Sequence, residues 1–170
     1  MRVDLIKDKL PQLPHVTSLS VHVHVIWERH SFGDGVAGLL TRFNNLKYLR
    51  LQQDEFPGYI KMDDFCSNDN DRKKSYNVCD HPDDWKPNDI SLPHLEEAEF
   101  RGLTGTDCEL RFLQSVLAST TGLQMVTINF NSNYCLNGRK EDFQIMLLGD
   151  GTWTAYHDDD DQWYEWRPSP

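Results

Sequence analysis

Apolar residues recur in one order in four segments of the chain, residues 13–21, 43–51, 92–100 and 120–128. They occupy the first, fourth, seventh and ninth positions of each segment, apart from Thr120 at the first position of the last one. Around the last two apolar positions, polar and apolar residues alternate, which is the pattern of a strand with one buried face. The pattern therefore predicts four short strands.

Helical spacing appears between these segments. Asp34 can cap a helix whose apolar residues are Val36, Leu39, Leu40 and Phe43. After the third segment, Thr106 and Glu109 have the spacing of a capping box that opens a second amphipathic helix. A third helix is predicted over about residues 141–148, before Gly149 and Gly151.

Strands that follow an LxxLxxLxL register and alternate with helices are typical of leucine-rich repeats. The segments begin at residues 13, 43, 92 and 120, in steps of 30, 49 and 28, so the repeat is irregular. The long middle step contains residues 57–91, which are rich in Asp, Asn and Pro and are predicted to be an inserted loop. We therefore expect an α/β fold: a short, irregular leucine-rich-repeat solenoid with parallel strands and outer helices.

The C-terminal part of the sequence, residues 150–170, has a different character. Residues 152–156 and 162–166 are rich in aromatic and β-branched side chains and flank an acidic run. They predict a β-hairpin that caps one end of the stack, with Trp153, Trp163 and Trp166 serving mainly in packing.

Composition limits the choice of partners. A chain of 170 residues fits a single domain, residues 1–170, and its net charge of -10 disfavours binding to nucleic acid. No apolar run is long enough for a membrane span, and the N-terminal residues do not form a signal peptide. We therefore expect an intracellular protein of the cytoplasm or nucleus, without a membrane partner.

Candidate chemical sites are few. His22 and His24 have a spacing seen in zinc sites but lack a third ligand of known position. Two further groups have metal-binding residue types without the spacing of a known site: Cys66 with Cys79 and His81, and residues 158–161. No phosphate-binding loop, nucleophile elbow or HExxH motif occurs. We predict no metal, no cofactor and no catalytic residue, with an enzyme that uses an acidic or histidine site as the alternative.

Side-chain alternation also predicts which residues a partner would contact. Residues between the buried strand positions point to the opposite, exposed face. The predicted partner-binding residues are Ser20, His22, Tyr48, Arg50, Gln52, Glu97, Glu99, Arg101, Thr127 and Asn129. We expect the largest contributions from Tyr48, Arg50 and the pair of Glu97 and Glu99, because interface energy concentrates in aromatic and Arg side chains.

Several of these features, in this order, resemble one known family. They are a Cys followed by an acidic linker containing Trp (residues 79–85), the strand at 92–100, a Gly-Leu-Thr-Gly run at 102–105, a helix with Glu109, Phe112 and Leu113, and the strand at 123–128. This arrangement resembles the C-terminal repeat region of plant F-box proteins with leucine-rich repeats, of the FBD type. Residues 43–52 and the tail are similar as well.

The resemblance implies a non-catalytic module that binds a protein target, as the substrate-recognition part of an F-box ubiquitin-ligase receptor does. It does not extend to the F-box that docks a Skp-type adaptor, because the repeats begin within about a dozen residues of Met1. Contact with that adaptor therefore stays open. A truncated remnant without independent activity is a further alternative, since solenoids need about three or more units.

Overall fold

The structure of the chain is a computed structural model that describes residues 10–25, 33–55, 90–103, 107–131, 151–157 and 162–169. Eight elements lie in these ranges: β1 (Ser18–Val25), α2 (Gly33–Leu40), β2 (Tyr48–Glu55), β3 (Glu97–Leu103), α4 (Asp107–Ala118), β4 (Met125–Phe130), β5 (Thr152–His157) and β6 (Gln162–Arg167).

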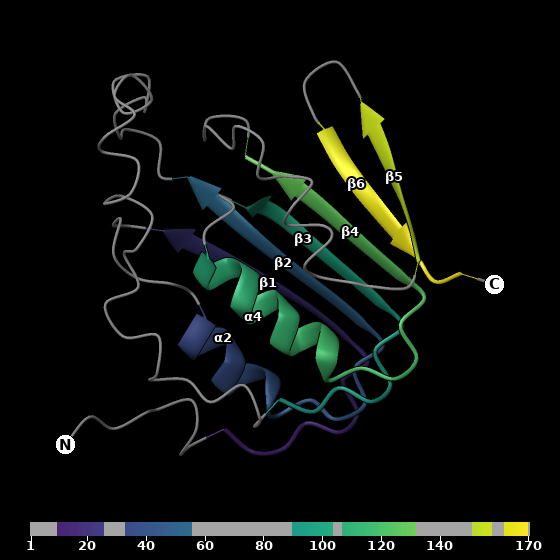
Figure 1. Ribbon diagram of the computed structural model, residues 1–170. Helices are drawn as coiled ribbons and strands as arrows, with labels where there is room; N and C mark the ends of the chain where they lie inside the picture. The colour runs from purple at the N-terminus through teal and green to yellow at the C-terminus, as the bar shows by residue number, and fades with distance from the viewer. Residues whose placement is uncertain are drawn as a thin grey trace.

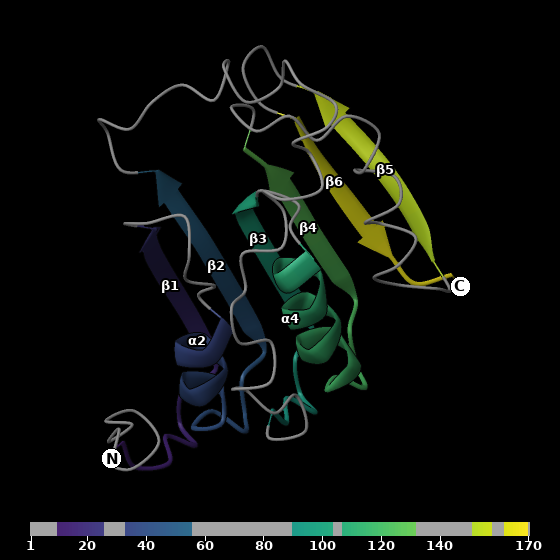
Figure 2. The same cartoon turned by 60° about the vertical axis from the view of Figure 1, so that its left-hand side comes forward.

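All six of these strands belong to one sheet, in the order β1-β2-β3-β4-β6-β5. The first four strands are parallel, whereas β6 pairs antiparallel with both β4 and β5. Figures 1 and 2 show α2 and α4 on the same side of the sheet. The α/β class is confirmed, but the sheet is mixed rather than purely parallel.

The four predicted strands are present, and they start at equivalent positions. Ser18, Tyr48, Glu97 and Met125 each begin a strand, and each is the sixth residue of its repeated segment. They are also register partners across the sheet. The first five residues of each segment therefore form the turn that leads into the strand.

One hydrogen-bond arrangement recurs at each parallel junction. The carbonyl of Thr17 accepts from the N–H groups of both Lys47 and Tyr48. The carbonyl of Lys47 accepts in the same way from Glu96 and Glu97, and that of Glu96 from Gln124 and Met125. The common sequence register thus becomes a common mode of strand pairing.

A second recurrence relates the two βαβ halves of the sheet, β1-α2-β2 and β3-α4-β4. The N–H of Leu13 donates to the carbonyl of Arg42 at 2.9 Å, and the N–H of Leu92 donates to the carbonyl of Ser119 at 3.3 Å. In both halves, the turn before the first strand is therefore tied to the segment that follows the helix.

The helix predictions have mixed outcomes. The first helix is confirmed, although it begins at Gly33, so Asp34 lies inside it, and it ends at Leu40, so Phe43 enters the core from beyond it. The second helix is confirmed as α4. Its predicted cap Thr106 and the predicted helix at 141–148 lie outside the described residues.

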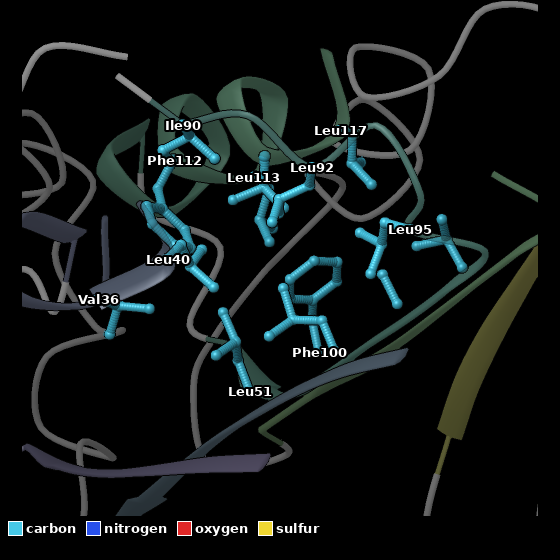
Figure 3. Packing of buried hydrophobic residues seen from close by; sticks show 14 of the residues in the cluster. Val36, Leu40, Leu51, Ile90, Leu92, Leu95, Phe100, Phe112, Leu113 and Leu117 are labelled. Atoms are coloured by element: carbon cyan, nitrogen blue, oxygen red, sulfur yellow. The ribbon is translucent and has the colours of Figure 1, made fainter. Parts of the chain in front are cut away.

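A single apolar core lies between the helices and the sheet. Figure 3 shows Phe112 and Leu113 of α4 beside Leu40, with Phe100 and Leu51 of the strands beneath them. Leu113 and Leu40 are completely buried, and Phe100 is nearly so. Because the buried cluster includes residues of β2, β3, β4, β6 and both helices, the repeated units and the hairpin strand share one core.

The predicted insert and hairpin can be checked in part. Most of the insert at 57–91 lies outside the described residues; Ile90, near its end, has no regular secondary structure and is buried in the core. The hairpin is confirmed as β5 and β6, and it extends the sheet beside β4. Trp166 and, in part, Trp153 pack into the core as expected.

Gly102 marks a break in the pairing of β3 with β4. The register shifts between Phe100 and Leu103, and Gly102 has a φ of 74°, a conformation that favours glycine. A Cβ at this position would lie 2.2 Å from the carbonyl oxygen of Gln53. Close approach of β2 therefore also requires glycine here.

None of the helices in the described ranges is long and apolar enough to cross a membrane.

Candidate functional site

The face of the sheet opposite the core is lined by polar side chains. No helix in the described ranges covers it, because α2 and α4 both lie on the other side (Figure 2). We call it the polar face and define it by the alternate residues of the first four strands: Ser18, Ser20, His22, Tyr48, Arg50, Gln52, Asp54, Glu97, Glu99, Arg101, Met125, Thr127 and Asn129.

All ten predicted partner-binding residues lie on the polar face. Register places Ser20, Arg50, Glu99 and Thr127 in one row across the four parallel strands. The side chains that contact one another, however, come mainly from β2 and β3. Ser20, Glu97 and Thr127 share the face but make no side-chain hydrogen bond to another described residue.

Glu99 is the centre of the polar face. Its Oε2 accepts a hydrogen bond from the Tyr48 hydroxyl at 2.6 Å and lies 3.7 Å from Nε of Arg50. Its Oε1 accepts from Nε of Arg101. The side chain of Glu99 is only 14% exposed, against 31% for Arg50 and 48% for Arg101. The carboxylate is therefore surrounded by its own donors, and the two guanidinium groups lie nearer the solvent.

This arrangement shifts the ionisation of both acidic groups in the cluster. Burial opposes ionisation of Glu99, but the hydrogen bonds from Tyr48 and Arg101 and the two Arg charges outweigh it, so its pKa lies below the ordinary value. Burial, together with the hydrogen bond to Glu99 and its charge, raises the pKa of Tyr48. At neutral pH the pair is thus a charged acceptor and a neutral donor.

A line of hydrogen bonds runs from Arg50 along β2 toward β1. Nη2 of Arg50 donates to Oε1 of Gln52 at 3.1 Å, and Nε2 of Gln52 donates to Oδ1 of Asp54 at 2.8 Å. Oδ2 of Asp54 in turn lies 3.6 Å from Nδ1 of His22. Together with the contacts of Glu99 on β3, these interactions order side chains of three strands before any partner binds, which reduces the entropic cost of binding.

Asn129 has a different position from the other predicted residues. Its Oδ1 accepts from the N–H of Gly102 at 3.4 Å, and its Nδ2 donates to the carbonyl of Gln162 at 3.0 Å. It thereby joins the break in β3 to the start of β6. Its amide is already engaged by the backbone, so a structural role takes precedence over contact with a partner.

The hairpin adds residues to the polar face that the sequence did not indicate. Trp163 is opposite Asn129 in the register, so its ring lies on this face and not in the core, where Trp166 lies. It stacks on Tyr156 with ring centroids 5.8 Å apart. Glu165 and Arg167 follow on the same strand, joined by a hydrogen bond of 2.7 Å.

Among the described residues, the polar face contains one pair of groups suited to acid–base chemistry. Within the ranges described, no three His, Cys, Asp or Glu side chains gather as a metal site would require. The Cys66 group and residues 158–161 lie outside those ranges, as does the side chain of His24. His22 and Asp54 form a His–carboxylate pair, but their side chains are 51% and 32% exposed.

The fold and this face together define a mixed α/β protein in which both described helices cover the same side of the sheet (Figure 2). No known family model matches the sequence, and a comparison with curated proteins likewise gives no match.

Proposed function

We propose that the chain is a non-catalytic protein–protein interaction module that binds its target through the polar face. The observation that carries this proposal is the cluster of Tyr48, Arg50, Glu99 and Arg101, in which an inner carboxylate orients two Arg side chains toward solvent. Arg and Tyr are the residue types in which interface energy concentrates.

The balance of charges suggests how a target is selected. Glu99 already accepts from Tyr48 and Arg101, so the outer parts of Arg50 and Arg101 are the groups offered to a target. Glu97 is exposed at the start of the same strand and supplies an acceptor. Because charges of both signs lie side by side, the face should select a target with a matching charge pattern and fix its orientation. It should not bind every acidic or every basic protein surface.

The architecture that we propose is a short leucine-rich-repeat solenoid, as in the repeat region of F-box substrate receptors. Its support is the uniform start of the four parallel strands and the carbonyl of Thr17, Lys47 or Glu96 that accepts two N–H groups at each junction. In this proposal the polar face takes the place of the receptor's target-binding surface, and any link to a Skp-type adaptor is a matter for experiment.

The enzyme alternative depends on His22 and Asp54. A carboxylate beside an imidazole is the start of a general-base arrangement, but it also requires a positioned nucleophile or substrate group. Among the described residues, none hydrogen-bonds to the other ring nitrogen of His22. The pair is also largely open to water, so we assign it to the recognition surface.

The proposal is tested by affinity capture with the full chain as bait and quantitative mass spectrometry as readout. The diagnostic variant is Arg101→Ala, which removes one exposed Arg from the polar face. Its matched control is Arg111→Ala, which removes one exposed Arg from α4, on the other side of the sheet. A target that binds the polar face is lost with Arg101→Ala and retained with Arg111→Ala.

The same experiment separates the alternatives. Equal retention of every partner by both variants would contradict binding through the polar face. Recovery of Skp-type or cullin proteins that both variants retain would indicate a ligase link through another surface. A bait that captures no specific partner and unfolds without cooperativity would favour the remnant.

A further inference from the structure

The first strand of the sheet has an edge that no other described strand pairs with. β1 is at the end of the sheet order, and its one strand partner there is β2 (Figures 1 and 2). It is eight residues long and contains no Pro, Lys, Arg, Asp or Glu. Proteins often protect an edge strand with such residues, and the sequence of β1 contains none of them.

The apolar side of β1 is less covered than that of its neighbours. Leu49 and Leu51 of β2 are almost completely buried, and so are their counterparts in β3 and β4. Leu19 and Val21 lie in the same rows but are only partly buried, and Val23, opposite Gln53, is only partly buried as well. The core therefore has an incompletely covered margin along β1.

The backbone of β1 also has donors that point outward. In β2, β3 and β4, the N–H of the first residue donates to the preceding unit. Ser18 is the equivalent residue of β1, so its N–H points away from β2. Because N–H directions alternate along a strand, Ser20 and His22 also direct their N–H groups to the outer edge.

We propose that β1 is the contact surface for a second copy of this chain, with the two β1 strands antiparallel about a two-fold axis at Val21. Val21 then lies opposite Val21 of the second copy, Leu19 opposite Val23, and Ser20 opposite His22. Leu19, Val21 and Val23 each meet an apolar side chain on the core side, and the outward N–H groups of Ser20 and His22 find carbonyl acceptors. The two sheets become one.

A second copy suits this edge because the strand is its own complement. The register above uses the same residues on both sides, as a closed two-fold interface requires. The chain carries a net charge of -10, so two copies repel where acidic side chains meet. β1 contains no Asp or Glu, so two copies can approach closely along it without contact between acidic side chains of the strand itself.

The first test is sedimentation velocity of the full chain from micromolar to submillimolar concentration. The proposal requires a reversible species of twice 19.8 kDa at the upper end of this range. A single 19.8 kDa species at every concentration would overturn it.

The second test identifies the edge. Ser20→Pro removes an outward N–H, and proline is tolerated on edge strands where the N–H faces away from the sheet. This variant should remain folded by circular dichroism and lose the dimer, whereas Ser20→Thr should keep both. If Ser20→Pro does not fold, Val21→Lys gives the same information, because it places two ammonium groups together at the axis. A dimer that survives in the folded variant contradicts the assignment to β1.

The third test fixes the register. Val21 faces itself in a pair without hydrogen bonds, where Cα atoms lie about 4.5 Å apart, a distance that a disulfide can span. Under mild oxidation Val21→Cys should give a disulfide-linked dimer, and Ser20→Cys and the unmodified chain should not, apart from any background from the four native cysteines. Equal cross-linking of all three contradicts the two-fold register. None of these changes alters the Arg101 site, so dimerisation and target binding can fail independently.

Discussion

The Tyr48 hydroxyl donates a 2.6 Å hydrogen bond to Oε2 of Glu99, across the junction of β2 and β3 and on the side of the sheet away from the core. The two residues are not direct register partners, since Tyr48 lies opposite Glu97 and Glu99 lies opposite Arg50. The bond is thus diagonal, and it orders a polar surface that strand pairing alone would leave undetermined.

Removing this hydroxyl should weaken the fold measurably. Tyr48→Phe keeps the ring but leaves a mostly buried carboxylate with one donor fewer, and a bond to a charged group contributes about 1.5 kcal/mol or more. We expect a loss of that order in the free energy of unfolding by urea titration. Tyr156→Phe is the control, because its ring is exposed and a surface change is worth about 0.5 kcal/mol or less. Equal effects would mean that the bond contributes little.

The ionisation of Glu99 should appear in the pH dependence of stability. Its pKa is lower in the folded state than its ordinary value, so its contribution is present above the unfolded pKa of about 4.3. This stabilising contribution of Glu99 is lost as the pH falls through the folded-state pKa, which lies below the unfolded-state pKa. In urea unfolding measured at a series of pH values from neutral to acid, Glu99→Gln should therefore show a shallower decline. An identical acid slope in the variant would contradict this account.

At alkaline pH the sign is opposite for Tyr48. Its pKa is raised in the folded state, so folding favours the protonated phenol. The contribution is complete below the unfolded pKa of about 10 and is lost as pH rises through the higher folded value. Thermal unfolding between neutral pH and the alkaline limit of the fold should show this loss in the wild-type chain and less of it in Tyr48→Phe. Parallel curves for the two proteins would rule it out.

Gly102 should not tolerate a side chain. Its φ of 74° and the 2.2 Å gap between an added Cβ and the Gln53 carbonyl both oppose substitution. We expect Gly102→Ala to cost about 2 kcal/mol or more in the free energy of unfolding. Gly122→Ala is the matched control, because no atom lies within 4 Å of an added Cβ there. A Gly102→Ala protein as stable as the control would refute the close approach of β2 to β3.

The shared core predicts a single unfolding transition. Leu113 is completely buried at the centre of α4, so Leu113→Ala should cost about 2–5 kcal/mol, whereas Leu39→Ala, at a partly buried position, should cost less. Both proteins should unfold in one step by circular dichroism and tryptophan fluorescence. Transitions that differ between the two probes would show that the units unfold separately, as a remnant with too little repeat would.

The strand and helix predictions depended mainly on the local spacing of apolar residues. Alternation around Leu49, Leu51, Ala98 and Phe100 requires one buried face, and once that face is fixed the polar face follows with no further information. The outer helices followed from apolar spacing in the same way. Ile90 was assigned to the insert because its neighbours in the sequence are polar or acidic, although its side chain is buried in the core near Phe112 of α4 (Figure 3).

The pattern of apolar residues could not predict contacts between residues far apart in the sequence. That β6 rather than β5 pairs with β4 depends on tertiary packing, and this choice decides that Trp163 faces the polar side while Trp166 is buried. Asp54 was missed because the predicted strand stopped short of it. The sequence pattern predicted that Tyr48, Glu99 and Arg101 share a face. It did not predict that Tyr48 and Arg101 each donate a hydrogen bond to a different carboxylate oxygen of Glu99.

The antiparallel hairpin has a consequence for how such a chain can lengthen during evolution. Each junction between parallel units requires a carbonyl such as that of Thr17, Lys47 or Glu96, presented by a strand of matching direction. Beside β4 that direction is reversed, because β6 runs antiparallel to it. A further parallel unit can therefore form the native junction with β4 only if its strand takes the place that β6 now occupies beside β4. Lengthening of the parallel part of the sheet at this end therefore requires β6 to pair with the new strand instead of β4.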